Sequence, residues 1–386
     1  MTEGIVGTVD EVFRAAAEMH RADRLEDASD AYRRILREHP DHFRALLMLG
    51  TIIMDAGRNG EAFELLDRSA VLAPQWSLPH LLRGQCLHRL GRLEEAAESM
   101  RRSITLEPNH VDAYFLLGTV LSDRGLFTEA VDTFRQVLRR NPSHLPTLVN
   151  LGGALDALGD QEGAVACLER ALSLEPGMAE AWGALSGIRL QQGRVDEATA
   201  LVRRALELRP DMAVFHMTLG NALGTAGRLD EAYTAYRRAL ELRPEYDEAH
   251  SNLILLNNFD PAHTAQSQQT ERRAWYQRVA ARLKGPIPAH TNPPDPERRL
   301  RVGYVTADFR NHSAAFLFGP VMRHHDRDRF EVVCYSGVMI EDAMTRGFKE
   351  QASLWRHTVG VSDEDMAEQI RRDGIDILVD LSGHTI

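Results

Sequence analysis

The pattern of small, apolar and polar positions changes once along the chain, near residue 285. Up to about residue 260 the same residue types return every 34 positions, and after residue 285 short runs rich in Val and Ile alternate with amphipathic stretches. A fixed period of this length is typical of stacked helical hairpins, whereas buried runs alternating with helices are typical of a parallel sheet. The sequence therefore predicts two architectures in succession.

Three positions define the periodic part. Each repeat ends at a proline, which cannot continue a helix, with an alanine 12 residues earlier and a small residue 24 residues earlier. Small residues on both helices of a hairpin predict a close crossing. From the second repeat on, a glycine 17 residues before the proline predicts a left-handed turn between the helices. The prolines are Pro40, Pro74, Pro108, Pro142, Pro176, Pro210 and Pro244.

This register indicates seven tetratricopeptide repeats, which with an eighth first helix near Asp247–Asn258 give an α-solenoid over residues 9–260. Pro261 then falls where the turn glycine belongs, and the polar stretch that follows predicts one capping helix within residues 261–284. Five prolines make residues 285–297 a stiff extended linker.

Residues 298–386 predict an α/β lobe. Strands are expected at Leu300–Val305, Phe330–Tyr335 and Ile375–Leu381, and helices at Ala315–His324, Ala343–Gln351 and Asp363–Arg372. Such an alternation describes the first half of a doubly wound, Rossmann-like fold, so we expect a partial lobe.

Composition narrows the class of protein. Hydrophobic residues make up 44% and charged residues 26%, and the net charge of −11 argues against a nucleic-acid-binding protein. No apolar run is long enough for a membrane span, and the first residues do not resemble a signal peptide, so we expect a cytoplasmic protein. Three widely spaced cysteines predict inert thiols, not disulfides or metal ligands.

Three blocks in the C-terminal segment carry a family resemblance. Residues Arg301–His312, His324–Ser336 and Asp373–Thr385 resemble, in order, the N-terminal catalytic lobe of the O-GlcNAc transferase and SPINDLY family. The resemblance implies a glycosyltransferase with two Rossmann-like lobes and no metal. It implies transfer of a sugar from UDP-GlcNAc or GDP-fucose to Ser and Thr of acceptor proteins held in the repeat groove. The family's second lobe is not found in this sequence, so we expect the isolated chain to be inactive.

Two histidines are the candidate catalytic residues. His312 lies in the loop after the first strand, where open α/β sheets place ligands, and an imidazole there could orient or deprotonate a hydroxyl. It also matches the family's Asp-Phe-x-x-His motif, and His384 occupies the matching position after the last strand. Asp326-Arg-Asp328 has the form of a metal-binding motif but precedes a strand, which favours a solvated loop.

The inner wall of the solenoid offers a candidate site for acceptor proteins. Asparagine amides can hold a peptide backbone regardless of its sequence. Because only Asn150 and Asn252 match the family's repeated asparagine, an ordinary solvated face is an equal alternative. The candidate acceptor-binding residues are Asn150, Asn252, Asn221, Gln85 and His88, and Thr119, Asp123 and Asp156 fall on or near the same face.

A second function class stays open at this stage. The repeats would also suit a non-catalytic scaffold for protein–protein interaction that keeps the lobe as a remnant. The sequence does not fix the oligomeric state, and a homodimer is compatible with it.

Overall fold

The computed structural model describes residues 8–259, 264–280, 290–295 and 297–381. Contacts within the chain separate two compact units, Met1–Ala154 and Leu155–Ile386, and each is treated by itself. The domain boundaries expected from the sequence remain predictions.

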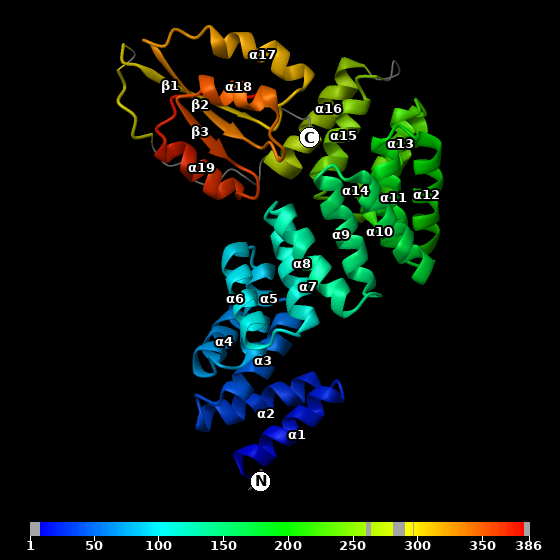
Figure 1. Ribbon diagram of the computed structural model, residues 1–386, viewed down its shortest axis with the longest axis vertical. Helices are drawn as coiled ribbons and strands as arrows, with labels where there is room; N and C mark the ends of the chain where they lie inside the picture. The colour runs from blue at the N-terminus through cyan, green and yellow to red at the C-terminus, as the bar shows by residue number, and fades with distance from the viewer. Residues whose placement is uncertain (1–7, 260–263, 281–289, 296, 382–386) are drawn as a thin grey trace. The chain divides into compact units, whose positions relative to one another are not determined.

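Paired antiparallel helices form the repeats, as predicted (Figure 1). The N-terminal unit contains α1 to α8 and most of α9, and the second unit continues with α10 to α15. The helices are α1 Val9–Arg21, α2 Leu25–Glu38, α3 Phe43–Asp55, α4 Asn59–Leu72, α5 Ser77–Arg89, α6 Leu93–Leu106, α7 Val111–Asp123, α8 Phe127–Arg140, α9 Leu145–Ala157, α10 Gln161–Leu174, α11 Ala179–Gln191, α12 Val195–Leu208, α13 Ala213–Thr225, α14 Leu229–Leu242 and α15 Asp247–Leu256.

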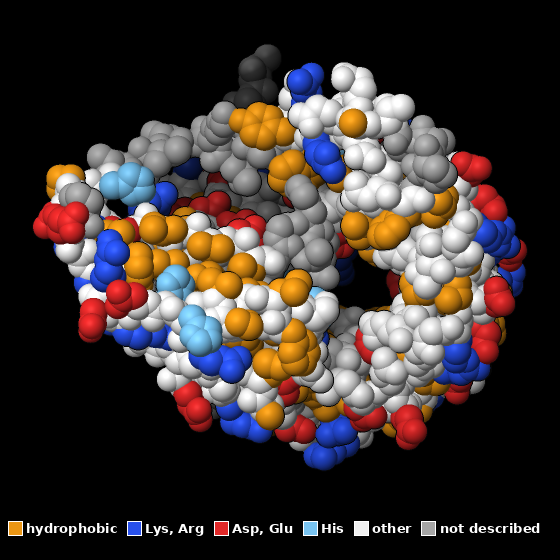
Figure 2. Space-filling view, turned by 90° about the horizontal axis from the view of Figure 1, so that it is seen from above, with side chains coloured by type: hydrophobic (Ala, Val, Ile, Leu, Met, Phe, Trp, Pro, Cys, Tyr) orange, Lys and Arg blue, Asp and Glu red, His pale blue; other side chains and the backbone are white. Residues whose placement is uncertain are grey.

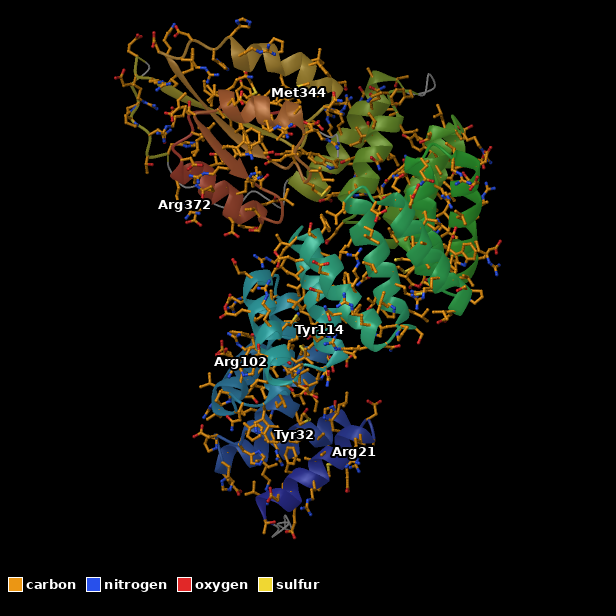
Figure 3. All side chains as sticks on the ribbon, in the orientation of Figure 1. Arg21, Tyr32, Arg102, Tyr114, Met344 and Arg372 are labelled. Atoms are coloured by element: carbon orange, nitrogen blue, oxygen red, sulfur yellow. The ribbon has the colours of Figure 1, made fainter. Side chains whose placement is uncertain are left out.

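The helix crossings confirm the small-residue register and add a position that the sequence analysis missed. The alanines 12 residues before the prolines are fully buried, as in Ala130. The side chain that covers the small residue is a larger one, eight residues before each proline: Phe134 over Gly118, and Tyr236 over Gly220. In the first repeat this position is Tyr32, labelled in Figure 3, which is fully buried with its ring centroid 5.7 Å from that of Phe13.

The turns between paired helices are left-handed, as predicted. The six turn glycines have φ between 72° and 81°. The first repeat has Asp23 at the equivalent position, and it adopts φ 59°. A short polar side chain tolerates this conformation better than a bulky one does.

The segment after the repeats is helical in its described part, and the ends of the predicted capping helix lie outside the described residues. Helix α16 covers Ala265–Trp275 and continues as the π-helical turn η1, Tyr276–Ala280. Residues 285–289 and 296 of the predicted linker lie outside the described residues. Within its described part, Asn292 donates hydrogen bonds to the carbonyl oxygens of Gly374 and Ile375, so this residue is anchored on the lobe.

The lobe is a four-stranded parallel sheet in the order β3-β2-β1-β4. Strand β1 (Leu300–Thr306) is central and pairs with β2 (Phe330–Ser336) and β4 (Ile377–Asp380). Strand β3 (Leu354–His357) was not predicted. We expected β4 to be a buried run, but Ile377 and Leu378 are 43% and 51% exposed because β4 is an edge strand in the described sheet.

Helices cover both faces of this sheet, as a doubly wound fold requires. Helices α17 (Ser313–Arg323) and α18 (Ala343–Gln351) pack on one face through Phe318 and Phe348. Helix α19 (Asp363–Arg372) packs on the other face, where Ile370 meets Val333. None of the helices in the described part of the chain is long and apolar enough to cross a bilayer.

Candidate functional site

The turn from β1 into α17 holds the candidate catalytic histidine. Strand β1 ends at Thr306, whose hydroxyl accepts a hydrogen bond from the amide of Asp308. His312 then caps α17 with extended backbone, and its side chain is 40% exposed. The parallel sheet therefore places this imidazole at the carboxyl end of its central strand, where α/β folds bind ligands.

Two groups compete for Nδ1 of His312. The amide of Ala314 donates to Nδ1 over 3.3 Å, while Oδ1 of Asp308 lies 3.5 Å from the same atom. The bond from Ala314 places the ring proton on Nε2. A proton on Nδ1 would instead face Asp308 and leave the Nε2 lone pair open to a substrate hydroxyl. Asp308 is mostly buried, and its carboxylate oxygen is the group that would accept the proton on Nδ1 in the second arrangement.

Acidic side chains dominate the same edge of the sheet. Asp342 caps α18 and accepts hydrogen bonds from the amides of Thr345 and Asn311, which hold the pKa of its carboxyl below the usual value. Glu341, also after β2, pairs with Lys349. Of the described residues in the turns after β1 and β2, Arg310 is the one arginine or lysine, against the carboxylates of Asp308, Glu341 and Asp342.

Of the other candidate motifs in the lobe, one lies outside the described residues and the others make local contacts. His384 lies outside the described residues, so its candidate role stays a prediction. Asp326 and Asp328 form a turn before β2, in which the Asp328 amide donates to Asp326 Oδ1. His325 Nε2 lies 2.6 Å from the hydroxyl of Tyr304. Nothing in the sequence had indicated that these two residues are in contact.

A patch of hydrophobic side chains with histidines beside it is visible on the lobe in Figure 2. The exposed apolar residues of α17 are Phe316, Leu317 and Val321, which are 61%, 80% and 57% exposed. Within the described residues, nothing packs against this face of the helix, which begins one residue after His312.

The inner-wall residues largely bond to one another. In the N-terminal unit, Asn150 Nδ2 donates to Thr119 Oγ1 over 3.3 Å, and His88 Nε2 lies 2.6 Å from Asp123 Oδ2. Gln85 lies half-buried on α5, one turn from His88. Each named bond joins the first helices of neighbouring repeats.

In the second unit, Asn252 Nδ2 donates to Asn221 Oδ1 over 3.0 Å, and the hydroxyl of Tyr236 donates to the same oxygen over 2.6 Å. Tyr236 is a partner that the sequence analysis missed. The signal was available, because Tyr236 occupies the buried position eight residues before its repeat's proline.

Comparisons with known proteins agree with this division of the chain. The family described as "Glycosyl transferase family 41" matches residues 262–386, and that described as "Tetratricopeptide repeat" matches residues 21–75. The "Cilia and flagella-associated protein 70 C-terminal domain" matches residues 80–283, the repeat helices and the helix after them, so the chain shares the repeat architecture of that family.

Two similar curated proteins are transferases of one kind. The probable UDP-N-acetylglucosamine–peptide N-acetylglucosaminyltransferase SPINDLY of Oryza sativa subsp. japonica is 34% identical over 139 residues, covering 35% of this chain and 15% of that protein. Its Arabidopsis thaliana counterpart is 38% identical over 95 residues, covering 24% and 10%. The chain thus matches 10–15% of the length of these relatives.

Solved structures extend the likeness to the fold. A mutant of the Thermobaculum terrenum O-GlcNAc transferase has a TM-score of 0.60 at 35% identity, covering 64% of this chain and 47% of that one. A tetratricopeptide repeat protein from Parabacteroides merdae has a TM-score of 0.57 at 15% identity, covering 64% and 98%, which shows the repeat fold alone. The chain therefore combines tetratricopeptide repeats with a segment, residues 262–386, that matches glycosyltransferase family 41, and it is similar to O-GlcNAc transferases and SPINDLY proteins.

Proposed function

We propose that this protein transfers a sugar from a nucleotide sugar, UDP-GlcNAc or GDP-fucose, to Ser and Thr hydroxyls of other proteins, and that its repeats recruit those acceptors. The observation that carries the proposal is His312 at the carboxyl end of the central strand, inside the segment that matches family 41. We also propose a cytoplasmic location, because Cys86 and Cys334 are buried thiols of the kind that reducing compartments preserve.

In this proposal His312 acts on the acceptor. With its proton on Nδ1 and directed at Asp308, the imidazole accepts the hydroxyl proton at Nε2 while the hydroxyl oxygen attacks the anomeric carbon. The bond from that carbon to the nucleotide diphosphate breaks, and the diphosphate leaves with the electron pair. The imidazolium that forms faces the Asp308 carboxylate.

The described lobe is suited to the acceptor and not to the diphosphate. Stabilising a leaving diphosphate requires fixed donors or cations aimed at it. The turns after β1 and β2 instead carry Asp308, Glu341 and Asp342 beside the single Arg310. We therefore assign the stabilisation of the donor's diphosphate charge to groups that do not lie at this edge of the sheet.

A chimera tests the proposal. The chain would be joined to the part of the Thermobaculum terrenum O-GlcNAc transferase that it does not cover, and sugar transfer to a peptide library would be measured. We expect transfer that falls at least about a hundredfold in His312→Ala, the scale of general base catalysis. His324→Ala, an exposed histidine at the end of the same helix, is the matched control and should retain the parent rate.

The scaffold is the second candidate function, and the acidic edge of the sheet is the observation that favours it. A chimera that binds peptides but transfers no sugar, while the bacterial enzyme modifies the same peptides, would support the scaffold. Equal rates in His312→Ala and the parent would reject the role of this histidine.

A further inference from the structure

The inner wall of the solenoid changes at its C-terminal end. In earlier repeats, long side chains at two adjacent positions of the first helices join neighbouring repeats. Arg89 donates to Asp55 over 3.4 Å, His88 contacts Asp123 over 2.6 Å, and Gln191 donates to Asp156 over 3.2 Å. The repeat period places Gly224 and Thr225 at these two positions in α13.

Neither of these two residues can reach the next helix, and a hollow opens where the bridging side chains would be. Its volume is about 680 Å³, and it is lined by residues of α13, α14 and α15 and by Phe259. Leu255 and Phe259 on its wall are 44% and 67% exposed, and Met217 completes the apolar lining. Large apolar side chains that remain exposed in a concavity are typical of a binding surface.

The polar groups in the hollow have fixed directions. Asn221 Oδ1 accepts from both Tyr236 and Asn252, so its amide nitrogen remains a donor toward the hollow, and Asn252 Oδ1 remains an acceptor. Burial raises the pKa of Tyr236, which keeps its hydroxyl a donor in this bond. A donor and an acceptor side by side complement the carbonyl and N–H of an extended peptide.

One carboxylate sits at the rim. Glu248 is exposed and lines the hollow, and no ion pair engages it within the described part of the chain. A cationic side chain beside the apolar wall could form an ion pair with Glu248.

We propose that this hollow selects acceptor proteins by sequence: it takes a large apolar side chain of an extended segment against Leu255 and Phe259, and a neighbouring Lys or Arg against Glu248. The proposal rests on the proposed recruitment of acceptors by the repeats. It adds a preference that backbone contacts to asparagines alone would not give, because such contacts are independent of side chains.

Fluorescence anisotropy of the 386-residue chain tests the pocket without any sugar donor. The probe is a short fluorescein-labelled Gly/Ser peptide carrying Arg-Leu at its centre, compared with the same peptide carrying Arg-Ala or Glu-Leu. Burying the leucine side chain should strengthen binding about tenfold over alanine. Glu in place of Arg should weaken binding, and Glu248→Gln should remove that difference.

Gly224→Leu fills the hollow. A Cβ at Gly224 would lie 3.5 Å from the nearest side-chain atom, an ordinary contact, so the helix can accept it. This variant should lose the tenfold preference for leucine. Gly153→Leu is the matched control: Gly153 is an exposed helix position with nothing within 4 Å of an added Cβ, and it lies outside the hollow, so the preference should persist.

Equal affinity for the leucine and alanine peptides, or a preference that survives Gly224→Leu, would overturn the pocket. This failure can be told apart from failure of the proposed function. A chimera that transfers sugar with no preference for Arg-Leu peptides rejects the pocket alone, and peptide selection by a chain whose chimera is inert rejects the transferase alone.

Discussion

Replacing Gly118 by alanine should loosen the crossing of α7 and α8. A Cβ built at Gly118 would lie 2.5 Å from Cε1 and 2.6 Å from Cδ1 of Phe134, closer than real carbon atoms approach. Phe134 is fully buried, so its ring cannot swing into solvent and the helices must move apart. Overpacking of this kind costs about 1–3 kcal/mol, and the better helix propensity of alanine returns about 1 kcal/mol. We expect a net loss of up to about 2 kcal/mol.

The matched control is the same substitution at Gly153, in helix α9. Nothing lies within 4 Å of a Cβ at that position, so Gly153→Ala should gain the propensity term alone and stabilise by about 0.5–1 kcal/mol. Guanidinium unfolding of the whole chain, followed by far-UV circular dichroism, would compare the two midpoints. If both variants shifted in the same direction, the assignment of Gly118 to a close helix crossing would be refuted.

Three further predictions use other parts of the chain. A protein ending near residue 285 should be strongly helical by circular dichroism, because repeats bury their apolar faces on neighbouring repeats, and an unfolded product would refute that independence. Ala130→Leu should destabilise by about 1–3 kcal/mol in urea unfolding, whereas Glu95→Ala, which breaks a surface pair with Arg92, should cost under about 1 kcal/mol; equal midpoints would contradict the repeat register. Hydrogen bonds from Arg298 lower the pKa of Asp376, so the stability that this ionised carboxyl adds is present above about pH 4 and is lost as the pH falls through the lowered pKa. The stability gap between the parent and Asp376→Asn should therefore narrow as the pH is lowered from about 5 to about 2, and a gap independent of pH would contradict this pairing.

The repeat architecture was predictable because its signals are local. A glycine with positive φ and a proline that stops a helix act on their own segment, so they can be recognised without knowing the partners. The Phe134 contact could not be read in the same way. It requires the crossing angle that brings a residue eight positions before the proline over Gly118, and the sequence analysis had paired that glycine with an alanine instead.

In the lobe, a short strand could not be predicted from the sequence. Strand β3 has four residues, Leu354–His357, and half of them are polar, so the sequence contains no apolar run that would predict a strand there. Its pairing with β2 makes it a strand. The position of His312 after β1 was predictable from the motif. Its partners were not, since the contact with Asp308 depends on how the turn folds back into α17.

Titration of nucleotide sugars into the chain tests the central claim most directly, namely that this lobe supplies the acceptor side of a family 41 site. Because the turns after β1 and β2 carry the carboxylates of Asp308, Glu341 and Asp342 and the single cation Arg310, diphosphate charge would find little stabilisation there. Calorimetry with UDP-GlcNAc and GDP-fucose should show no binding tighter than millimolar. Micromolar binding that is lost in His312→Ala would contradict the claim and assign the donor to this lobe.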